Sequence, residues 1–243
     1  MMLPTLDMLY RALTIAALLT RCLGASASPV VYTQEVGEQG ILIKAPADVD
    51  KAALTAAAAI VRQMLGHVRP EIHARLVKRK AAIGITPKDR YVTALPEFAY
   101  QSGRKDAKGR DYDSFKIRGL GAVVGQPVTA TAEENLLNLP GDSMRGMSVT
   151  HHEFAHAVMN LGFSGADRAA WARIYRNGAD GELFRDCGSE GRFAMGNADE
   201  YWAVLSTAYF SRNWSDLNTP ETVKSHHSAA YQFIESVYGL PTR

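Results

Sequence analysis

Two histidines four residues apart enclose a glutamate in the segment His152-Glu153-Phe154-Ala155-His156. Positions four apart lie on one face of an α-helix, so both imidazoles can reach a single ion if this segment is helical. The glutamate beside the first histidine then lies close to a water molecule bound to that ion. This HExxH spacing therefore requires a helix and predicts a metal site in which Glu153 acts as general base toward water.

The residues around the motif favour this interpretation. Apolar, helix-compatible side chains flank it, and Gly162 stands where a helix C-cap is expected. These flanking residues are Val149, Val158 and Met159, together with Phe154 and Ala155 inside the motif. A chance match would instead make the two histidines ordinary helix residues and Glu153 a solvated charge. Burying such a polar group in an apolar helix is costly unless something satisfies it, which favours a metal.

A catalytic zinc ion takes three protein ligands and leaves one position open, so a third ligand must come from elsewhere. The other histidines offer weak alternatives, because His67, His73, His226 and His227 are expected on the surface of helices. A carboxylate in the apolar helix expected from Asn197 to Phe210 is the better candidate. Asn197 is a suitable N-cap, and either Asp199 or Glu200 could be the ligand. Glu200 could also simply complete a capping box.

The paired motifs resemble the gluzincin zinc metallopeptidases, the group related to the anthrax lethal factor catalytic domain and to the proline-specific endopeptidases. The resemblance rests on HEFAH and on Glu200 in the setting Asn-Ala-Asp-Glu-Tyr-Trp-Ala, and it covers about residues 130 to 235. It implies that Zn²⁺ is bound by His152, His156 and Glu200, and that Glu153 is the catalytic base. It also implies an α+β, zincin-like metallopeptidase domain with a small sheet and a largely helical catalytic half.

The sequence departs from this group at two places. Members carry a tyrosine seven residues before the ligand glutamate, where its hydroxyl stabilises the oxyanion, and this sequence has Phe193 there. Members also often have an acid three residues after it, where this sequence continues Ala203-Val204. Losing one oxyanion donor typically costs a factor of about 10² to 10³ in rate. Either another group supplies the donor, with His151, Tyr201 and Tyr91 as candidates, or the enzyme is slow or inactive.

The amino terminus has the pattern of a secretory signal peptide. An apolar run from Ala12 to Thr20 precedes Ala25-Ser26-Ala27, a cleavage site of the A-x-A type. The run is too short to span a membrane, so no stable membrane insertion is expected. We therefore expect residues 1–27 to be a signal peptide, residues 28–243 to form a single zincin-like domain, and the protein to be secreted or periplasmic.

Composition limits the class of partner. The chain is 47% apolar and 21% charged, with a net charge of +2, as in ordinary globular proteins. That balance provides no basic surface for nucleic acid and leaves the oligomeric state open. The expected partner is a peptide or protein substrate.

Local patterns predict the other elements. We expect strands within residues 30–45, a helix over 47–65 opened by Pro46, a helix over 72–80, and strands at 82–85 and 128–131. A polar loop covers 101–114, and the glycine-rich segment 118–125 is expected to be a substrate-facing edge strand. Helices are expected to start at 133 and to span 166–175, with a last helix over 219–234.

Together these features predict an exported zinc metallopeptidase that hydrolyses peptide bonds. The alternative is a zinc-binding protein that has lost most or all catalysis and acts by binding, for which Phe193 is the main argument.

Overall fold

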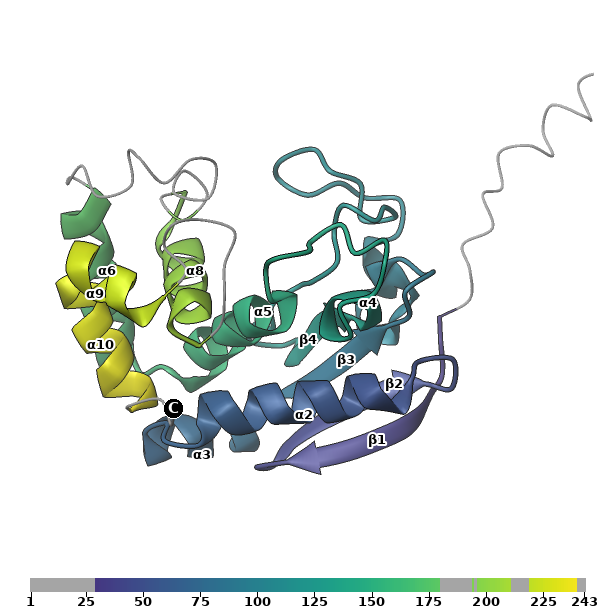
Figure 1. The fold of residues 1–243 in the computed structure, drawn as a ribbon, viewed down its shortest axis with the longest axis horizontal. Helices are drawn as coiled ribbons and strands as arrows, with labels where there is room; N and C mark the ends of the chain where they lie inside the picture. The colour runs from purple at the N-terminus through teal and green to yellow at the C-terminus, as the bar shows by residue number, and fades with distance from the viewer. Residues whose placement is uncertain (1–28, 180–193, 195, 211–218, 240–243) are drawn as a thin grey trace, which may run out of the picture.

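The computed structural model describes residues 29–179, 194, 196–210 and 219–239. The expected signal peptide and Phe193 lie outside the described residues. Figure 1 shows a small sheet at one end of the protein and a group of helices at the other, with the helix that carries the HExxH motif between them.

The sheet has four strands in the order β1-β2-β3-β4. β1 (Tyr32–Glu38) pairs antiparallel with β2 (Ile41–Pro46), and β2 pairs parallel with β3 (Ala82–Thr86). β3 pairs parallel with β4 (Val128–Ala132). The strands expected within 30–45, at 82–85 and at 128–131 are therefore confirmed.

Alternating residues send their side chains to opposite faces of this sheet. On one face, Ile41, Ile43, Ile83 and Ile85 are fully buried in the main apolar core, which α2 also contributes to. On the other face lies a second, smaller apolar cluster. It comprises Ala82, Val128 and Ala130 with Val92, Leu95, Phe98 and Ile117. The single-turn segments η1 (Val92–Ala94) and η2 (Pro96–Gln101) supply part of that cluster.

The first long helix begins later than the sequence predicts. Pro46 ends β2, and α2 spans Lys51–Leu65 with Asp50 as its N-cap. The Asp50 carboxylate accepts a hydrogen bond from the Ala52 amide at 2.8 Å, which satisfies a free donor of the first turn. The next helix, α3, spans Pro70–Lys78, so here the proline does stand in the first turn.

The segment expected as an edge strand over 118–125 is not a regular strand. It pairs with β4 at one point, where Leu120 and Ala130 exchange backbone hydrogen bonds of 3.2 and 2.9 Å in an antiparallel bridge. Its start is fixed by Arg118, which is 2% exposed and donates to both carboxylate oxygens of Glu134 at 2.5 and 2.8 Å. Glu134 lies in the short helix α4 (Glu133–Leu136). We call residues 118–121 the edge segment.

The remaining helices make up the helical half of the protein. α5 (Val149–Ala157) continues into a π-helical turn, η3 (Val158–Gly162), which is followed by α6 (Gly165–Ala179) and α8 (Ala198–Phe210). The last predicted helix is in fact two, α9 (Pro220–His226) and α10 (Ser228–Tyr238). Within the described chain, no helix combines the length and the apolar character needed to cross a bilayer.

The break between α9 and α10 falls at His227, whose ψ of 52° leaves the helical range. The expectation that His227 is a surface histidine is wrong, because it is 3% exposed. Its Nδ1 lies 3.0 Å from the Tyr201 hydroxyl, so a buried hydrogen bond accounts for its burial.

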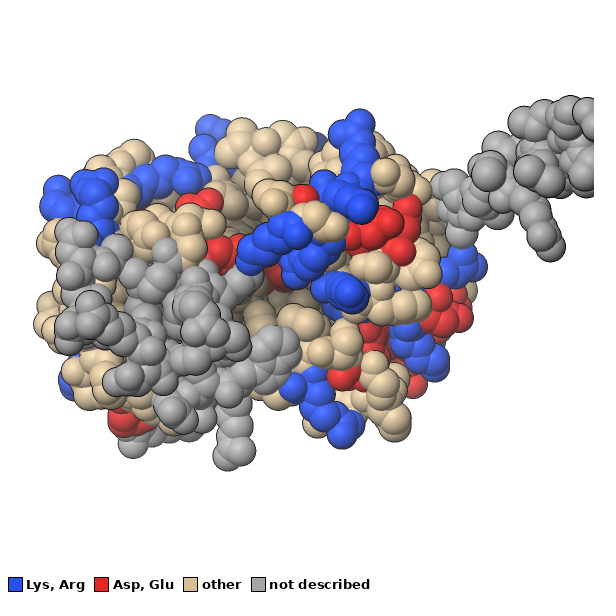
Figure 2. Space-filling view, turned by 90° about the horizontal axis from the view of Figure 1, so that it is seen from above, with Lys and Arg blue, Asp and Glu red and all other residues tan. Residues whose placement is uncertain are grey.

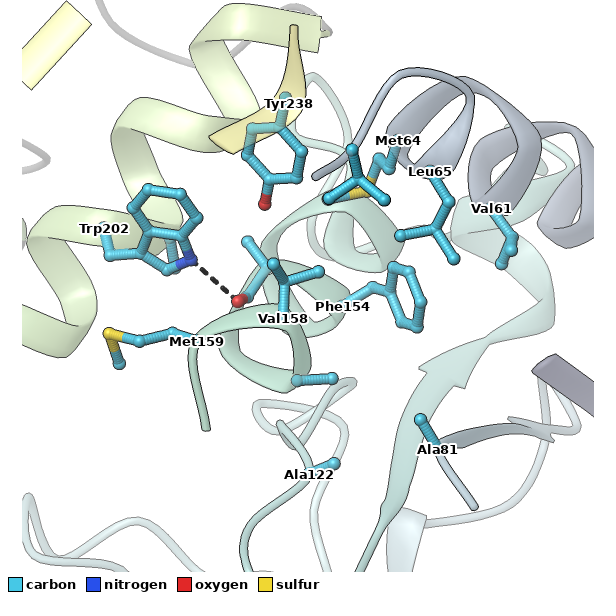
Figure 3. Close-up of a cluster of buried hydrophobic side chains, with 14 of the residues drawn as sticks. Val61, Met64, Leu65, Ala81, Ala122, Phe154, Val158, Met159, Trp202 and Tyr238 are labelled. Carbon is cyan, nitrogen blue, oxygen red and sulfur yellow. Dashed lines mark hydrogen bonds between the residues drawn. The ribbon is translucent and has the colours of Figure 1, made fainter. Parts of the chain in front are cut away.

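α5 and α8 pack against each other through the main core (Figure 3). Phe154 and Trp202 are fully buried there, and the Trp202 indole N–H donates to the Ala155 carbonyl at 2.8 Å. This contact fixes α8 against the helix that carries the histidines. The predicted fold class, α+β with a small sheet and a largely helical half, is confirmed.

Candidate metal centre

The HExxH segment is helical, as its spacing requires. Ser148 is the N-cap of α5 and accepts a hydrogen bond from the His151 amide at 3.5 Å. Phe154 turns into the core, whereas His152, Glu153 and His156 line a cavity. The helix thereby separates the apolar and the polar residues of the motif onto opposite faces.

α8 carries Glu200 to the two histidines. The Asn197 side-chain oxygen accepts hydrogen bonds from the amides of Asp199 at 3.0 Å and Glu200 at 2.8 Å, so Asn197 is the N-cap that the sequence predicts. The Glu200 carboxylate oxygen Oε2 lies 3.2 Å from His152 Nε2 and 3.7 Å from His156 Nε2. Glu200 therefore faces the histidines, and the exposed Asp199 is not part of this group.

These three side chains fit a zinc ion. Each offers one ligand atom, and the three atoms all lie within 4.8 Å of one another. Two ligands of a tetrahedral zinc ion, each about 2.0–2.1 Å from the metal, are separated by about 3.4 Å. The distances of 3.2 and 3.7 Å from Glu200 to the two imidazoles bracket this value. Two imidazoles and one carboxylate are also a donor set that leaves a fourth position open for water.

The electrostatics of the group are those of closely coupled opposite charges. Burial by itself raises the pKa of Glu200, but hydrogen bonds and positive charge from His152 and His156 outweigh it and lower the pKa. Burial likewise lowers the pKa of His156, and the Glu200 carboxylate reverses this and raises it. Burial raises the pKa of Glu153, and the histidine charges oppose the rise. The site is therefore anionic overall when the imidazoles are neutral, which suits a divalent cation.

The edge segment lies directly against the motif. A methyl group added at Gly119 would stand 2.5 Å from Glu153 Cγ and 2.8 Å from its carboxylate oxygen Oε1. A methyl group added at Gly121 would stand 2.5 Å from His156 Cβ. Both contacts are shorter than carbon atoms tolerate, so the two glycines permit an approach that other residues would prevent.

His151, one of the candidate oxyanion donors, is directed away from the cavity. Its Nδ1 lies 2.7 Å from Ser148 Oγ and its Nε2 lies 3.0 Å from Gln63 Oε1. The side chain is buried, and burial lowers its pKa to about 4. His151 therefore ties α5 to α2 as a neutral side chain and does not reach the histidine pair.

The two tyrosines considered as oxyanion donors, Tyr201 and Tyr91, also lie outside the cavity. Tyr201 is buried with its hydroxyl against His227, and Tyr91 is exposed with its ring packed edge-on against Phe115. Neither of them lines the cavity. Among the described residues that do line it, Tyr112 is the one tyrosine, and sequence reasoning did not single it out.

The cavity has a volume of about 770 Å³ and is bounded by several parts of the chain. The main ones are the polar loop with Lys116 just after it, the edge segment, α5 with η3, and α8 with its N-cap; Val123, Met144 and Met147 also line the cavity. The predicted polar loop therefore forms part of the cavity wall. Which of its side chains face the cavity has no signal in the sequence, because long-range contacts decide it.

No protein-family model matches the chain, and no curated protein matches it in sequence. Among solved structures, the chain is similar to the PRO-PRO endopeptidase (PPEP-2) from Paenibacillus alvei, with a TM-score of 0.55 and 19% sequence identity. The match covers 79% of this chain and 95% of that chain. At this identity the likeness concerns the fold alone.

Proposed function

We propose that this protein is a zinc-dependent peptidase in which His152, His156 and Glu200 bind the metal. The observation that carries the proposal is the convergence of the two Nε2 atoms and the Glu200 Oε2 within 4.8 Å of one another, beside Glu153 and inside a cavity. This arrangement unites the HExxH helix with a carboxylate from a second helix. The solved structure with the similar fold is itself named an endopeptidase, which agrees with a peptide substrate.

In the proposed reaction the metal and Glu153 have different roles. A bound zinc ion lowers the pKa of a water molecule and polarises a carbonyl oxygen. The Glu153 carboxylate takes a proton from water in the cavity and later delivers it to the leaving amine nitrogen. Gly119 leaves room for that side chain, because a Cβ at this position would collide with Glu153.

The edge segment offers a place for the substrate backbone. Leu120 directs its N–H and C=O toward Ala130 of β4. If the chain is extended on either side of this bridge, we infer that Gly119 and Gly121 direct their backbone groups to the opposite side. Gly119 and Gly121 both line the cavity. An extended peptide can pair with their backbone groups as an added strand, which holds it across the face of α5.

We also propose that the protein acts outside the cytoplasm after removal of residues 1–27, on the basis of the apolar run and the Ala25-Ser26-Ala27 site. Amino-terminal sequencing of exported protein tests this directly. Sequence that begins at Ser28 supports cleavage after Ala27, and sequence that begins at Met1 contradicts it.

Metal analysis and a peptide-library digest test the peptidase. We expect one zinc ion per chain, lost in His156→Ala and kept in His67→Ala, a control in which the changed histidine is exposed and does not line the cavity. Glu153→Gln is expected to keep the zinc and lose hydrolysis. A wild-type protein that binds no stoichiometric zinc, or a Glu153→Gln variant as active as wild type, contradicts the proposal.

A second candidate function follows from Phe193, which stands where the resembling peptidases have an oxyanion-stabilising tyrosine. In that case the protein binds zinc and peptides without cleaving them. Retention of zinc together with no cleavage of any library member distinguishes this candidate from the peptidase.

A further inference from the structure

The wall of the cavity formed by the polar loop is built around Asp106. Its Oδ1 accepts hydrogen bonds from the amides of Lys108 at 2.9 Å and Arg110 at 2.7 Å. The Asp106 amide donates to the Arg110 carbonyl at 2.9 Å, and Lys105 and Asp111 pair across the same hairpin. The backbone of the hairpin therefore fixes where its side chains stand.

Arg110 is held by this hairpin and lines the cavity. Its Nε donates to Asp106 Oδ2 at 2.6 Å, and both residues line the cavity together with Glu153. No described residue accepts a hydrogen bond from its two terminal nitrogens. A pair of donors in this position matches the two oxygens of a carboxylate.

The charges that line the cavity are unevenly divided between its walls. Arg118 also lines the cavity, but its guanidinium is paired with the Glu134 carboxylate. Glu200 belongs to the metal centre, and Glu153 lies beside it. The polar loop contributes Lys108 and Arg110 to the lining beside Asp106, and the exposed Lys116 follows just after the loop. No described side chain pairs with Lys116, so this wall carries an excess of positive charge. Figure 2 shows Lys and Arg side chains gathered along one rim of the hollow in this face.

We propose that this wall binds a carboxylate of the substrate through Arg110 and Lys116, so that the protein prefers acidic peptides. The inference rests on the proposed peptidase function and names the class of peptide that the same cavity takes. Asp199, which is exposed at the start of α8, places a negative charge on the opposite wall of the cavity. An acidic side chain of the substrate is therefore favoured only on the side of the peptide that faces Arg110 and Lys116.

Binding of labelled peptides to zinc-loaded Glu153→Gln protein tests the preference without requiring turnover. Three peptide pools differ only in two central residues, which are Glu, Gln or Lys, and each pool is made with an amidated and with a free carboxyl end. The Kd of each pool is measured by fluorescence anisotropy at low and at raised salt. We expect the Glu pool to bind about tenfold more tightly than the Gln pool at low salt, as one charge-assisted hydrogen-bond pair provides.

Variants in the same background assign the effect to the wall. Arg110→Gln and Lys116→Gln are expected to reduce the preference for Glu to about threefold or less, whereas Lys78→Gln, which changes an exposed lysine of α3 outside the cavity, leaves it intact. The double variant Arg110→Glu/Lys116→Glu is expected to bind the Lys pool best. A gain from the free carboxyl end in the Gln pool would identify the chain end, rather than a side chain, as the source of the carboxylate.

Two results would overturn the inference, and they differ in what they say about the proposed function. Equal binding of the amidated Glu, Gln and Lys pools, with no gain from a free end, removes the acidic preference but leaves a peptide-binding protein. Failure of every pool to bind contradicts the peptidase as well.

Discussion

Gly119 and Gly121 touch different members of the motif, so substitutions at the two positions should have separable effects. In Gly119→Ala the new methyl group would stand 2.5 Å from both Glu153 Cγ and Val149 Cγ1, so these two side chains, neither of them a proposed metal ligand, must rotate away. We expect a loss of at least about tenfold in kcat with zinc affinity unchanged, because the base moves and the ligands do not. Steady-state kinetics and zinc competition with a chelator measure the two quantities.

Gly121→Ala provides the matched comparison. Its methyl group meets His156 at Cβ, which cannot move without a shift of α5. Zinc affinity should therefore fall along with kcat. If the alanine at 119 weakened zinc binding as much as the alanine at 121, the separate roles assigned to these glycines would be wrong.

Phe193→Tyr adds a single hydroxyl group and so tests whether an oxyanion donor is missing at this position. The resembling peptidases have a tyrosine at this position, so the substitution should raise kcat by up to about 10²-fold if the surrounding geometry is the same. An unchanged kcat in an active enzyme would indicate that the donor lies elsewhere. Tyr112→Phe, at the tyrosine that lines the cavity, should then lower kcat.

At the scale of elements, the edge segment depends on the buried pair of Arg118 and Glu134. Arg118 also donates to the carbonyls of Arg90 at 2.6 Å and Pro87 at 3.2 Å, so it joins three parts of the chain. Glu134→Ala leaves this guanidinium buried without its carboxylate. We expect the free energy of unfolding to fall by about 3–5 kcal/mol in urea denaturation.

The double variant Arg118→Met/Glu134→Leu controls for the buried charge. It removes both partners, so its loss of stability should be clearly smaller than that of Glu134→Ala. Hydrogen exchange at Leu120 and Ala130 should accelerate in Glu134→Ala, since this pair anchors the bridge to β4. Similar stability of the single variant and wild type would show that the pair does not hold the edge segment.

At the scale of the whole molecule, a metal bound by α5 and α8 should stabilise the fold. Zinc in about hundredfold excess over its Kd contributes about 2.7 kcal/mol, which raises the Tm of a protein of this size by about 5–10 °C. Glu200→Ala should lose most of this gain, and the neighbouring Asp199→Ala should keep it. Differential scanning calorimetry with zinc and with a chelator measures the shift; equal gains in the two variants would contradict the ligand assignment.

Stability should also depend on pH through Asp167, which joins the start of α6 to α3. Its carboxylate accepts from the Ser164 amide at 2.8 Å and pairs with Arg69 at 2.5 Å. Burial tends to raise the pKa of Asp167, but the hydrogen bonds from Ser164 and the charge of Arg69 lower it below its usual range. The stabilisation is therefore present above the unfolded pKa of about 3.9 and is lost as the pH falls through the lower folded value.

Asp167→Asn should accordingly be less stable than wild type by about 1–2 kcal/mol at pH 7, and the difference should shrink below about pH 3. Urea denaturation at several pH values measures it, with Asp89→Asn, an exposed aspartate, as the control. A difference that stayed constant from pH 7 to pH 2.5 would show that the Asp167 charge is not the cause.

Elements with strong local signals are predictable from the sequence, and those fixed by distant contacts are not. The HExxH helix and the N-cap at Asn197 follow from spacing and capping chemistry within a few residues. The sequence places the start of α2 too early, because Pro46 suits a first turn and Asp50 suits an N-cap, and only the pairing of β2 decides between them. The break at His227 interrupts a continuous amphipathic pattern, so the periodicity conceals it.

In the candidate site, too, the residues fixed by distant contacts could not be predicted from the sequence. The choice between Asp199 and Glu200 depends on the rotation of α8 about its axis, which the packing of Trp202 against α5 sets. Arg110 reaches the cavity through a hairpin whose place relative to α5 no local pattern encodes. The roles of the metal ligands and of Glu153 remain predictions that the experiments above test.

The π-helical turn Val158–Gly162 directly follows His156 and accommodates one surplus residue. Because that turn absorbs the excess, the residues before it keep their helical phase and the two imidazoles stay aligned. The same insertion between His152 and His156 would rotate the second imidazole by about 100° and remove it from the shared face. The chain can therefore grow by single residues after the motif, but not within it.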